Sequence, residues 1–273
     1  MFVIGIVGVV IVGLLVAAVL SLSAADRKLL FSAKQTYNGR TYSVVVPKHI
    51  TPQTKIILGL DGFGGNGKRF GYYTGLHNAD TEAVVIYPDP LPPTRRGEQG
   101  GWNAGFCCGT GWVHKTDDVA FLTELVRRVA GRLEMTEARV FAAGFSNGAF
   151  MVQRLAIEQP QLLSAVAIVS GSLGTRSNYL KPSRPLPILL VHGAKDAVVP
   201  FKGGTGRTGD EFDWQPFDVM RAAWQRANQG KAKVITKIYP DFGHGWKGWR
   251  RLNVWHKEPS QSQEIIAFFN ECR

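Results

Sequence analysis

A serine between glycines is the strongest chemical signal in the sequence. The motif Gly-Phe-Ser-Asn-Gly at 144–148 comes directly after the apolar run 139–143 and opens a segment with helical spacing, 147–158. Glycines on both sides permit a tight strand-to-helix turn, which exposes the serine and aims the next backbone N–H at a substrate oxygen. With a strand before it and a helix after it, the motif predicts Ser146 as a nucleophile rather than as part of an ordinary glycine-rich turn.

Two later loops hold the residue types that a nucleophilic serine requires. A serine hydroxyl attacks an acyl group only when a base removes its proton and a carboxylate orients that base. Asp196 follows the apolar run 187–191, and His244 follows the run 233–239. The chain order serine, aspartate, histidine is the order that the α/β-hydrolase sheet imposes. We therefore predict Ser146 as nucleophile, His244 as base and Asp196 as the residue that orients it.

Other histidines and carboxylates compete for these roles. His192 is the chief alternative base, but it ends a buried run ahead of Asp196, where a side chain usually braces the turn. His256 lies beyond a tryptophan-rich segment, and the remaining three histidines precede the serine, against the expected order. Asp241 and Asp210 are alternative carboxylates that do not directly follow a strand, so we expect them on the solvated surface.

Acyl transfer also needs two hydrogen-bond donors for the oxyanion. The backbone N–H of Asn147 supplies one. The second is expected from the glycine-rich loop 61–67, where we predict the Phe63 N–H. A phosphate-binding loop is the alternative for this segment, but it lacks the Gly-Lys-Ser/Thr ending of that motif.

Short apolar runs alternate with helical patterns along the chain. The predicted strands are 42–46, 55–60, 83–87, 139–143, 165–169, 187–191 and 233–239, and the predicted helices are 117–133, 147–158, 216–228 and 260–271. This alternation predicts an α/β class, an α/β-hydrolase fold with a mostly parallel sheet and helices on both faces. Ligands of such sheets gather at the carboxyl ends of the strands, where the three predicted catalytic residues follow their runs.

The first residues form a segment separate from the catalytic domain. Residues 2–22 carry no charged side chain and are rich in valine, isoleucine, leucine, glycine and alanine. We expect 1–25 to be a cleaved signal peptide or a membrane anchor, and 26–273 to be one catalytic domain. Both alternatives place the catalytic domain outside the cytoplasm, so the expected location is extracellular or periplasmic.

The formal net charge of +11 bears on the partners of the protein. The basic residues are scattered and no nucleic-acid motif accompanies them, so a nucleic-acid partner is not expected. Solubility or attraction to an anionic polysaccharide surface explains the positive charge better than nucleic-acid binding does. Membrane contact is expected only through the apolar N-terminal segment.

Three cysteines are too few for a disulfide-built scaffold and lack metal-finger spacing. A large hydrophobic core must therefore supply the stability. In an oxidising compartment, one of the neighbours Cys107 and Cys108 could pair with Cys272, but sequence alone leaves the connectivity open.

Five ordered blocks of the sequence resemble a known group of secreted esterases. The blocks are Trp-Asn-Ala-Gly-Phe-Cys-Cys-Gly at 102–109, Asp-Asp-Val-Ala-Phe-Leu at 117–122, Gly-Phe-Ser-Asn-Gly-Ala-Phe-Met at 144–151, His-Gly-Ala-Lys-Asp-Ala-Val-Val-Pro-Phe at 192–201 and Gly-His-Gly-Trp at 243–246. They are similar to the polyhydroxybutyrate depolymerase and feruloyl esterase group, carbohydrate esterase family one. The resemblance implies the same triad, a place outside the cytoplasm, no metal or organic cofactor, and substrates that are short-chain polyesters or aromatic acyl esters of plant polysaccharides.

Two positions depart from the pattern of that group. Asp61 stands where relatives commonly carry histidine before the oxyanion loop, and an anion there could weaken oxyanion stabilisation. Lys247 stands where the group's final motif has proline, which predicts a difference in substrate choice.

Three further residues are candidate substrate contacts. Trp102 and Trp246 could line an acyl or aromatic pocket, with core packing as the alternative. Asn103 could contact substrate or brace its loop. Asp117 and Asp118 are expected to cap the helix that follows them.

Together these residues predict a secreted serine ester hydrolase that works through an acyl-enzyme. Acyl transfer to an alcohol would use the same site, and product analysis with added alcohol separates the two activities. A catalytically impaired, esterase-like binding protein is the alternative that Asp61 favours. Labelling of Ser146 by a fluorophosphonate distinguishes an activated serine from this last alternative.

Overall fold

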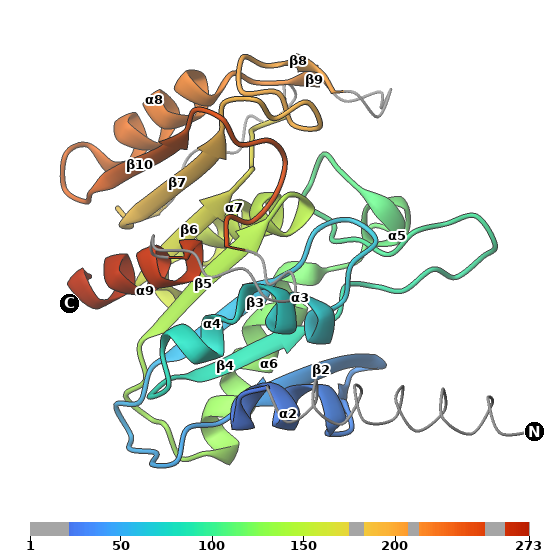
Figure 1. Ribbon diagram of the computed structural model, residues 1–273, viewed down its shortest axis with the longest axis vertical. Helices are drawn as coiled ribbons and strands as arrows, with labels where there is room; N and C mark the ends of the chain where they lie inside the picture. The colour runs from blue at the N-terminus through green and yellow to red at the C-terminus, as the bar shows by residue number, and fades with distance from the viewer. Residues whose placement is uncertain (1–21, 175–182, 207–212, 249–259, 273) are drawn as a thin grey trace, which may run out of the picture.

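Alternating apolar runs build a central sheet that is buried on both sides. The computed structural model describes residues 22–174, 183–206, 213–248 and 260–272. Within them, eight strands pair in the order β1-β2-β4-β3-β5-β6-β7-β10 (Figure 1). Their bounds are β1 Gln35–Tyr37, β2 Arg40–Val45, β3 Ile56–Leu60, β4 Val84–Pro88, β5 Val140–Phe145, β6 Ala165–Val169, β7 Ile188–Gly193 and β10 Val234–Tyr239. The strands from β4 to β10 in this order are parallel, whereas β2 is antiparallel to both β1 and β4.

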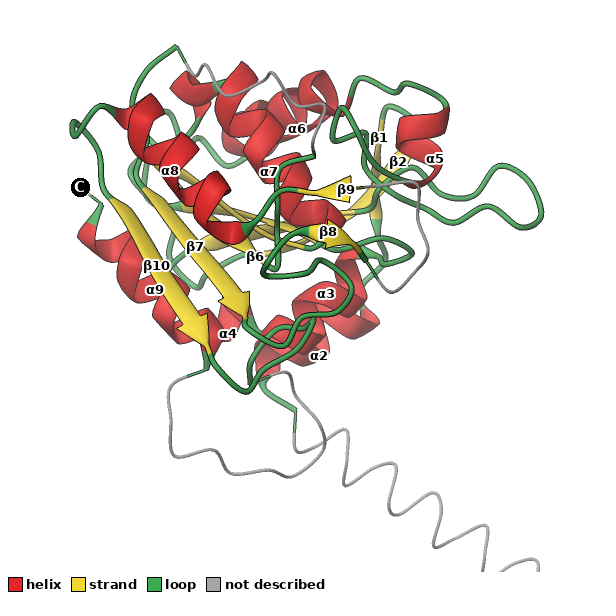
Figure 2. Ribbon diagram, turned by 90° about the horizontal axis from the view of Figure 1, so that it is seen from above, coloured by secondary structure: helices red, strands yellow, loops and turns green. Residues whose placement is uncertain are grey.

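Helices cover the two faces of the sheet, as Figure 2 shows. One layer contains α6 (Asp118–Arg132), α7 (Asn147–Glu158) and α8 (Phe217–Asn228), and the other contains α2 (Ala24–Phe31), α3 (Gly67–Thr74), α4 (Leu76–Ala79) and α9 (Gln261–Glu271). Successive strand residues alternate between the layers: Ile56 and Leu58 pack with the α6–α8 cluster, and Ile57 packs with the opposite one. Because both of their faces are buried, the strands β3 to β7 are almost continuously apolar.

The predicted fold class is confirmed. The sheet is mostly parallel with helices on both faces, and the predicted bounds of 147–158 and 165–169 match α7 and β6. The sequence patterns missed the short elements, among them α3 and α5 (Gly109–Val113) and the small pairing of β8 (Gly204–Thr205) with β9 (Asp213–Trp214). Helix α3 has the sequence GKRFGYYT, and two glycines and three aromatic residues give it low intrinsic helix propensity.

The N-terminal part of the described chain packs into the domain. Helix α2 begins at Ala24, two residues before the predicted start at 26. Ser23 and Asp26 form a reciprocal capping box at its first turn. Asp26 is fully buried, and its Oδ1 lies 3.1 Å from His77 Nε2. Residues 1–21, and with them nearly all of the predicted leader, lie outside the described residues. No helix within the described residues is long and apolar enough to cross a membrane.

The cysteine pairing was left open by the sequence. Cys107 and Cys108 form a disulfide with each other, and Cys272 is a free, partly buried thiol. The end of α9 is held instead by Arg139, whose guanidinium donates to the Cys272 carbonyl at 2.9 Å.

Candidate active site

Ser146 occupies a sharp turn between β5 and α7. Its φ of 54° and ψ of −121° lie outside the usual regions for a non-glycine residue. The turn depends on glycine: a Cβ on Gly144 would lie 2.3 Å from the Gly148 carbonyl oxygen, and one on Gly148 would lie 2.2 Å from the Leu60 oxygen. The Ser146 N–H donates to the Val169 carbonyl at 3.0 Å, which ties the turn to β6.

Asp196 and His244 meet beyond two neighbouring parallel strands. β7 and β10 end side by side, with Gly193 paired to Tyr239, so the loops that follow lie at the same edge of the sheet. His244 Nδ1 lies 2.8 Å from Asp196 Oδ2. The other oxygen of Asp196 accepts the backbone N–H groups of Val198 and Val199, both at 2.9 Å.

A second histidine contacts the same carboxylate. His192 Nε2 lies 2.9 Å from the Val199 carbonyl oxygen and 3.4 Å from Asp196 Oδ2. Burial raises the pKa of Asp196, but interactions with His192, His244 and the Val199 amide outweigh it, and the net pKa lies below the usual range. Asp196 is therefore ionised at neutral pH and favours the His244 tautomer with its proton on Nδ1, which leaves Nε2 as the basic nitrogen.

The alternative residues have other surroundings than those predicted for a base or for the carboxylate that orients it. His192 is 2% exposed and braces the Asp196 turn, the position expected from its place at the end of a strand. Asp241 is on the surface, with its side chain 89% exposed and 2.7 Å from Lys195 Nζ. Asp210 and His256 lie outside the described residues.

Ser146 and His244 line one pocket of about 270 Å³. Its other lining residues are Asp61, Gly62, Phe63, Gly64, Gly65, Arg69, Tyr73, Phe145 and Val198. The ring centroid of His244 lies 4.8 Å from that of Phe145. The pocket thus brings together the carboxyl ends of β3, β5, β7 and β10 and the first turns of α3.

The predicted oxyanion residues flank the serine. Asn147 is the first residue of α7, where backbone N–H groups have no partner inside the helix. Its side chain is buried and brackets Trp102: Oδ1 accepts the Trp102 N–H at 2.7 Å, and Nδ2 donates to the Trp102 carbonyl at 3.1 Å. Across the pocket, a Cβ on Gly62 would lie 3.2 Å from the Ser146 Cβ, so the loop of Phe63 approaches the serine closely.

Asp61 organises this loop from within. Its Oδ1 accepts the Gly62 N–H at 2.7 Å and its Oδ2 accepts the Asn66 N–H at 2.9 Å. Burial raises the pKa of Asp61 to about 6, against the lowering effect of these two amides and of Arg69. From the sequence, the negative charge of Asp61 was expected to weaken oxyanion stabilisation. In the structure, its carboxylate accepts hydrogen bonds from the backbone of its own loop.

The predicted aromatic contacts lie in the core. Trp102 is 0% and Trp246 1% exposed, and neither lines the 270 Å³ pocket. Each indole N–H has an internal acceptor: Trp102 Nε1 donates to the Asp61 carbonyl and Trp246 Nε1 to Ser262 Oγ, both at 3.0 Å. These bonds let the rings pack inside the protein, so the core-packing alternative describes both tryptophans.

The remaining candidates brace the loop at 102–118. Asn103 Nδ2 donates to the Thr116 carbonyl at 2.9 Å and its Oδ1 accepts the Gly105 N–H at 3.1 Å, which makes it a loop brace rather than a pocket residue. Asp117 caps α6 as predicted, accepting the Ala120 N–H at 2.9 Å. Asp118 is fully buried and forms an ion pair with Arg40.

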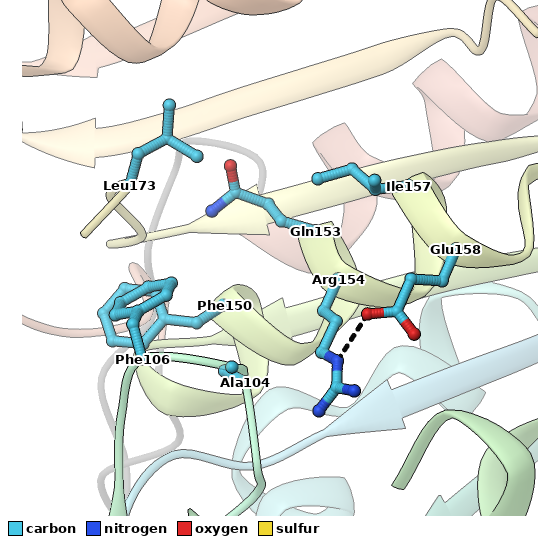
Figure 3. A pocket seen from close by; sticks show the side chains of 9 residues that line it. Ala104, Phe106, Phe150, Gln153, Arg154, Ile157, Glu158 and Leu173 are labelled. Carbon is cyan, nitrogen blue, oxygen red and sulfur yellow. Dashed lines mark hydrogen bonds and ion pairs between the residues drawn. The ribbon is translucent and has the colours of Figure 1, made fainter. Parts of the chain in front are cut away.

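Two other hollows adjoin this region. The first has about 20 Å³ of space, room for about one water molecule, next to α7. Figure 3 shows Phe106, Phe150 and Leu173 at one end of it and Ile157 and Glu158 at the other. The second is a groove of about 630 Å³ that shares Gly64 and Gly65 with the pocket of Ser146 and continues past Asp89 and Gln99. Of these three hollows among the described residues, the 270 Å³ pocket is the one that contains Ser146 and His244.

The chain is similar to known esterases. Residues 117–207 match the Phospholipase/Carboxylesterase family. The "Probable feruloyl esterase C" of Aspergillus niger is 29% identical over 226 residues, which cover 76% of this chain and 77% of that protein. Feruloyl esterase C of Emericella nidulans is 31% identical over 176 residues, which cover 61% and 58% respectively.

Solved structures agree on the architecture. The carboxylesterase of Bacillus cereus superposes with a TM-score of 0.58 at 16% identity, covering 86% of this chain and 96% of the other. The carboxylesterase of Mesorhizobium loti also gives 0.58, at 15% identity, covering 88% and 99%. The structures show that the fold is that of an α/β-hydrolase, and the sequence matches to esterases support a serine ester hydrolase.

Proposed function

We propose that this serine ester hydrolase works through Ser146, His244 and Asp196 by way of an acyl-enzyme. In this mechanism His244 Nε2 takes the Ser146 proton as Oγ attacks the ester carbonyl. The backbone N–H groups of Asn147 and Phe63 stabilise the oxyanion. His244 returns the proton to the departing alkoxide, and then activates a water that releases the acid and regenerates the serine.

One observation carries the proposal. Ser146 stands at a strained turn in the same pocket as His244, whose Nδ1 is 2.8 Å from the buried Asp196 carboxylate. A nucleophile, a base and a group that orients the base are the parts that acyl transfer requires.

Feruloyl or acetyl esters of polysaccharides, or short-chain polyesters, are the proposed substrates. The aromatic side chains of Phe63, Tyr73 and Phe145 on the pocket wall suit a flat acyl group. The adjoining 630 Å³ groove offers room for a polymer beyond the scissile bond. The feruloyl esterase names of the relatives favour the aromatic acyl group, and the apolar residues 2–22 favour action outside the cytoplasm.

Hydrolysis by the purified full-length chain tests the proposal. The wild type should cleave p-nitrophenyl acetate, p-nitrophenyl butyrate or methyl ferulate at neutral pH, and Ser146→Ala should lower kcat by at least about 10⁴-fold while remaining folded. A fluorophosphonate should label the wild type at Ser146 alone. Folded wild type that neither hydrolyses these esters nor becomes labelled would contradict the proposal and favour the binding-protein alternative.

A further inference from the structure

The wall of the catalytic pocket carries a cation that the ester mechanism does not use. Among the described lining residues of the 270 Å³ pocket, Arg69 is the one side chain with a permanent positive charge. Its guanidinium carbon lies 5.2 Å from the ring centroid of Tyr73, one helical turn further along α3. Stacking on the ring leaves the N–H groups at the edge of the guanidinium plane for a partner.

No acidic side chain in the described part of the chain forms an ion pair with Arg69. Asp61 lines the same pocket, but its two oxygens accept the Gly62 and Asn66 amides. Asp196 is 5% exposed and is engaged by His244 and by the amides of its own loop. Arg69 therefore lines the pocket without an ion pair to either carboxylate, although its charge contributes to lowering the pKa of Asp61.

The start of helix α3 does not favour a positive charge at Arg69. Lys68 and Arg69 both lie in the first turn of α3, where the helix dipole opposes positive charge, and no acidic residue stands in that turn. Lys68 has a structural role, because its ammonium donates to the carbonyls of Leu30 and Ser32 at the end of α2. Arg69 is exposed and lines the pocket instead, so an anion bound there would offset the local cost.

We infer that Arg69 makes this site select esters that carry a carboxylate on their acyl or alcohol part. The inference rests on the proposed function, because it assigns a substrate class to that same pocket. A guanidinium binds a carboxylate through two parallel hydrogen bonds, which gives both affinity and orientation. The net charge of +11 would also draw anionic substrates toward the protein.

Two matched pairs of esters test the inference and separate the acyl side from the alcohol side. Mono-p-nitrophenyl adipate and its methyl ester differ in charge on the acyl part, and 3-butyryloxybenzoate and its methyl ester differ on the alcohol part. In the wild type, kcat/KM should favour the acid over the neutral ester about five- to twentyfold in at least one pair, and less at high ionic strength. Arg69→Gln should lower kcat/KM for the acid more than for its neutral ester and so abolish this preference, and Arg69→Lys should keep part of it.

Lys68→Gln is the matched control, since it removes the same charge from the same helical turn but from a side chain that faces α2. It should leave the acid preference intact. Equal wild-type rates on both members of each pair, an unchanged preference in Arg69→Gln, or an equal loss in Lys68→Gln would overturn the inference while leaving the esterase function standing. No hydrolysis of any of the four esters by folded wild type would contradict the proposed function, and the inference with it.

Discussion

Two buried carboxylates at the same edge of the sheet behave in opposite ways. Asp61 follows β3 and is 7% exposed, and Asp196 follows β7 and is 5% exposed. Each accepts two backbone N–H groups from its own loop. Yet the pKa of Asp61 is raised to about 6 and that of Asp196 is lowered.

The difference lies in the side chains around each carboxylate. Burial is the largest influence on both and raises both pKa values. His192 and His244 contact Asp196 and reverse the effect, whereas Asp61 has only its two amides and the more distant Arg69. Two amides are thus too few to keep a buried carboxylate fully charged. Asp196 suits a role that needs constant charge, and Asp61 suits that of a loop brace.

Removing the charge of Asp196 should have the largest effect on activity. Asp196→Asn keeps the shape but no longer favours the His244 tautomer with its proton on Nδ1, so kcat should fall by about 10³- to 10⁴-fold. Steady-state hydrolysis of p-nitrophenyl butyrate measures the loss.

Asp241→Asn is the matched control, because it changes an exposed carboxylate in the loop of His244 whose partner is the surface Lys195. Its kcat should stay within about twofold of the wild type. A comparable loss in both variants would mean that the loop, rather than the Asp196 charge, limits catalysis.

The Asp61 loop should tolerate less change at its glycines than the His244 loop. A Cβ on Gly65 would lie 2.0 Å from Asp61 Oδ2, while one on Gly243 would meet its nearest neighbour, the Lys195 carbonyl oxygen, at 3.7 Å. Gly65→Ala should displace the carboxylate and the adjacent Phe63 amide and lower kcat about 10- to 100-fold. This loss is smaller than the roughly 10³-fold loss in kcat that removal of an oxyanion donor can cause.

Gly243→Ala should remain within about twofold of the wild type. Melting temperatures of the two variants would show that both are folded. Full activity in Gly65→Ala would exclude a part for the Asp61 loop in positioning the oxyanion donors.

Much of the frame that holds the site could be predicted from the sequence. The central parallel strands are nearly continuous apolar runs, and the turn at Ser146 needs glycines, because a Cβ atom at 144 or 148 would clash with the backbone. Such constraints are local, so they can be recognised from the order of the residues. The sequence pattern predicted that Asp196 and His244 follow two strands, and in the structure His244 Nδ1 lies 2.8 Å from Asp196 Oδ2.

The walls of the pocket could not be predicted, because they depend on which side of each element faces the site. Trp102 and Trp246 lie near the site in sequence motifs, yet their indole N–H groups find acceptors in the core. Arg69 and Tyr73 lie on a helix whose glycines hide it from pattern analysis. The disulfide between Cys107 and Cys108 likewise depends on a loop conformation that spacing does not encode.

The smallest expected effect is on stability, and it comes from the protonation of Asp61. A raised folded pKa means that the folded protein holds this proton more tightly than the unfolded chain. The stability that the neutral form provides is fully present below the usual carboxyl pKa and is lost as pH rises through about 6. Asp61→Asn lacks this proton, so between pH 4.5 and 7.5 the free energy of unfolding of the variant should improve relative to wild type by about 2 kcal/mol. Urea unfolding of both proteins at the two pH values measures the difference, and all other titrations shared by the two proteins cancel.

The exposed Asp241→Asn serves as control and should show the same difference from wild type at both pH values. A constant difference for Asp61→Asn as well would mean that Asp61 is ionised throughout this range, and that its two amides alone suffice to stabilise a buried charge.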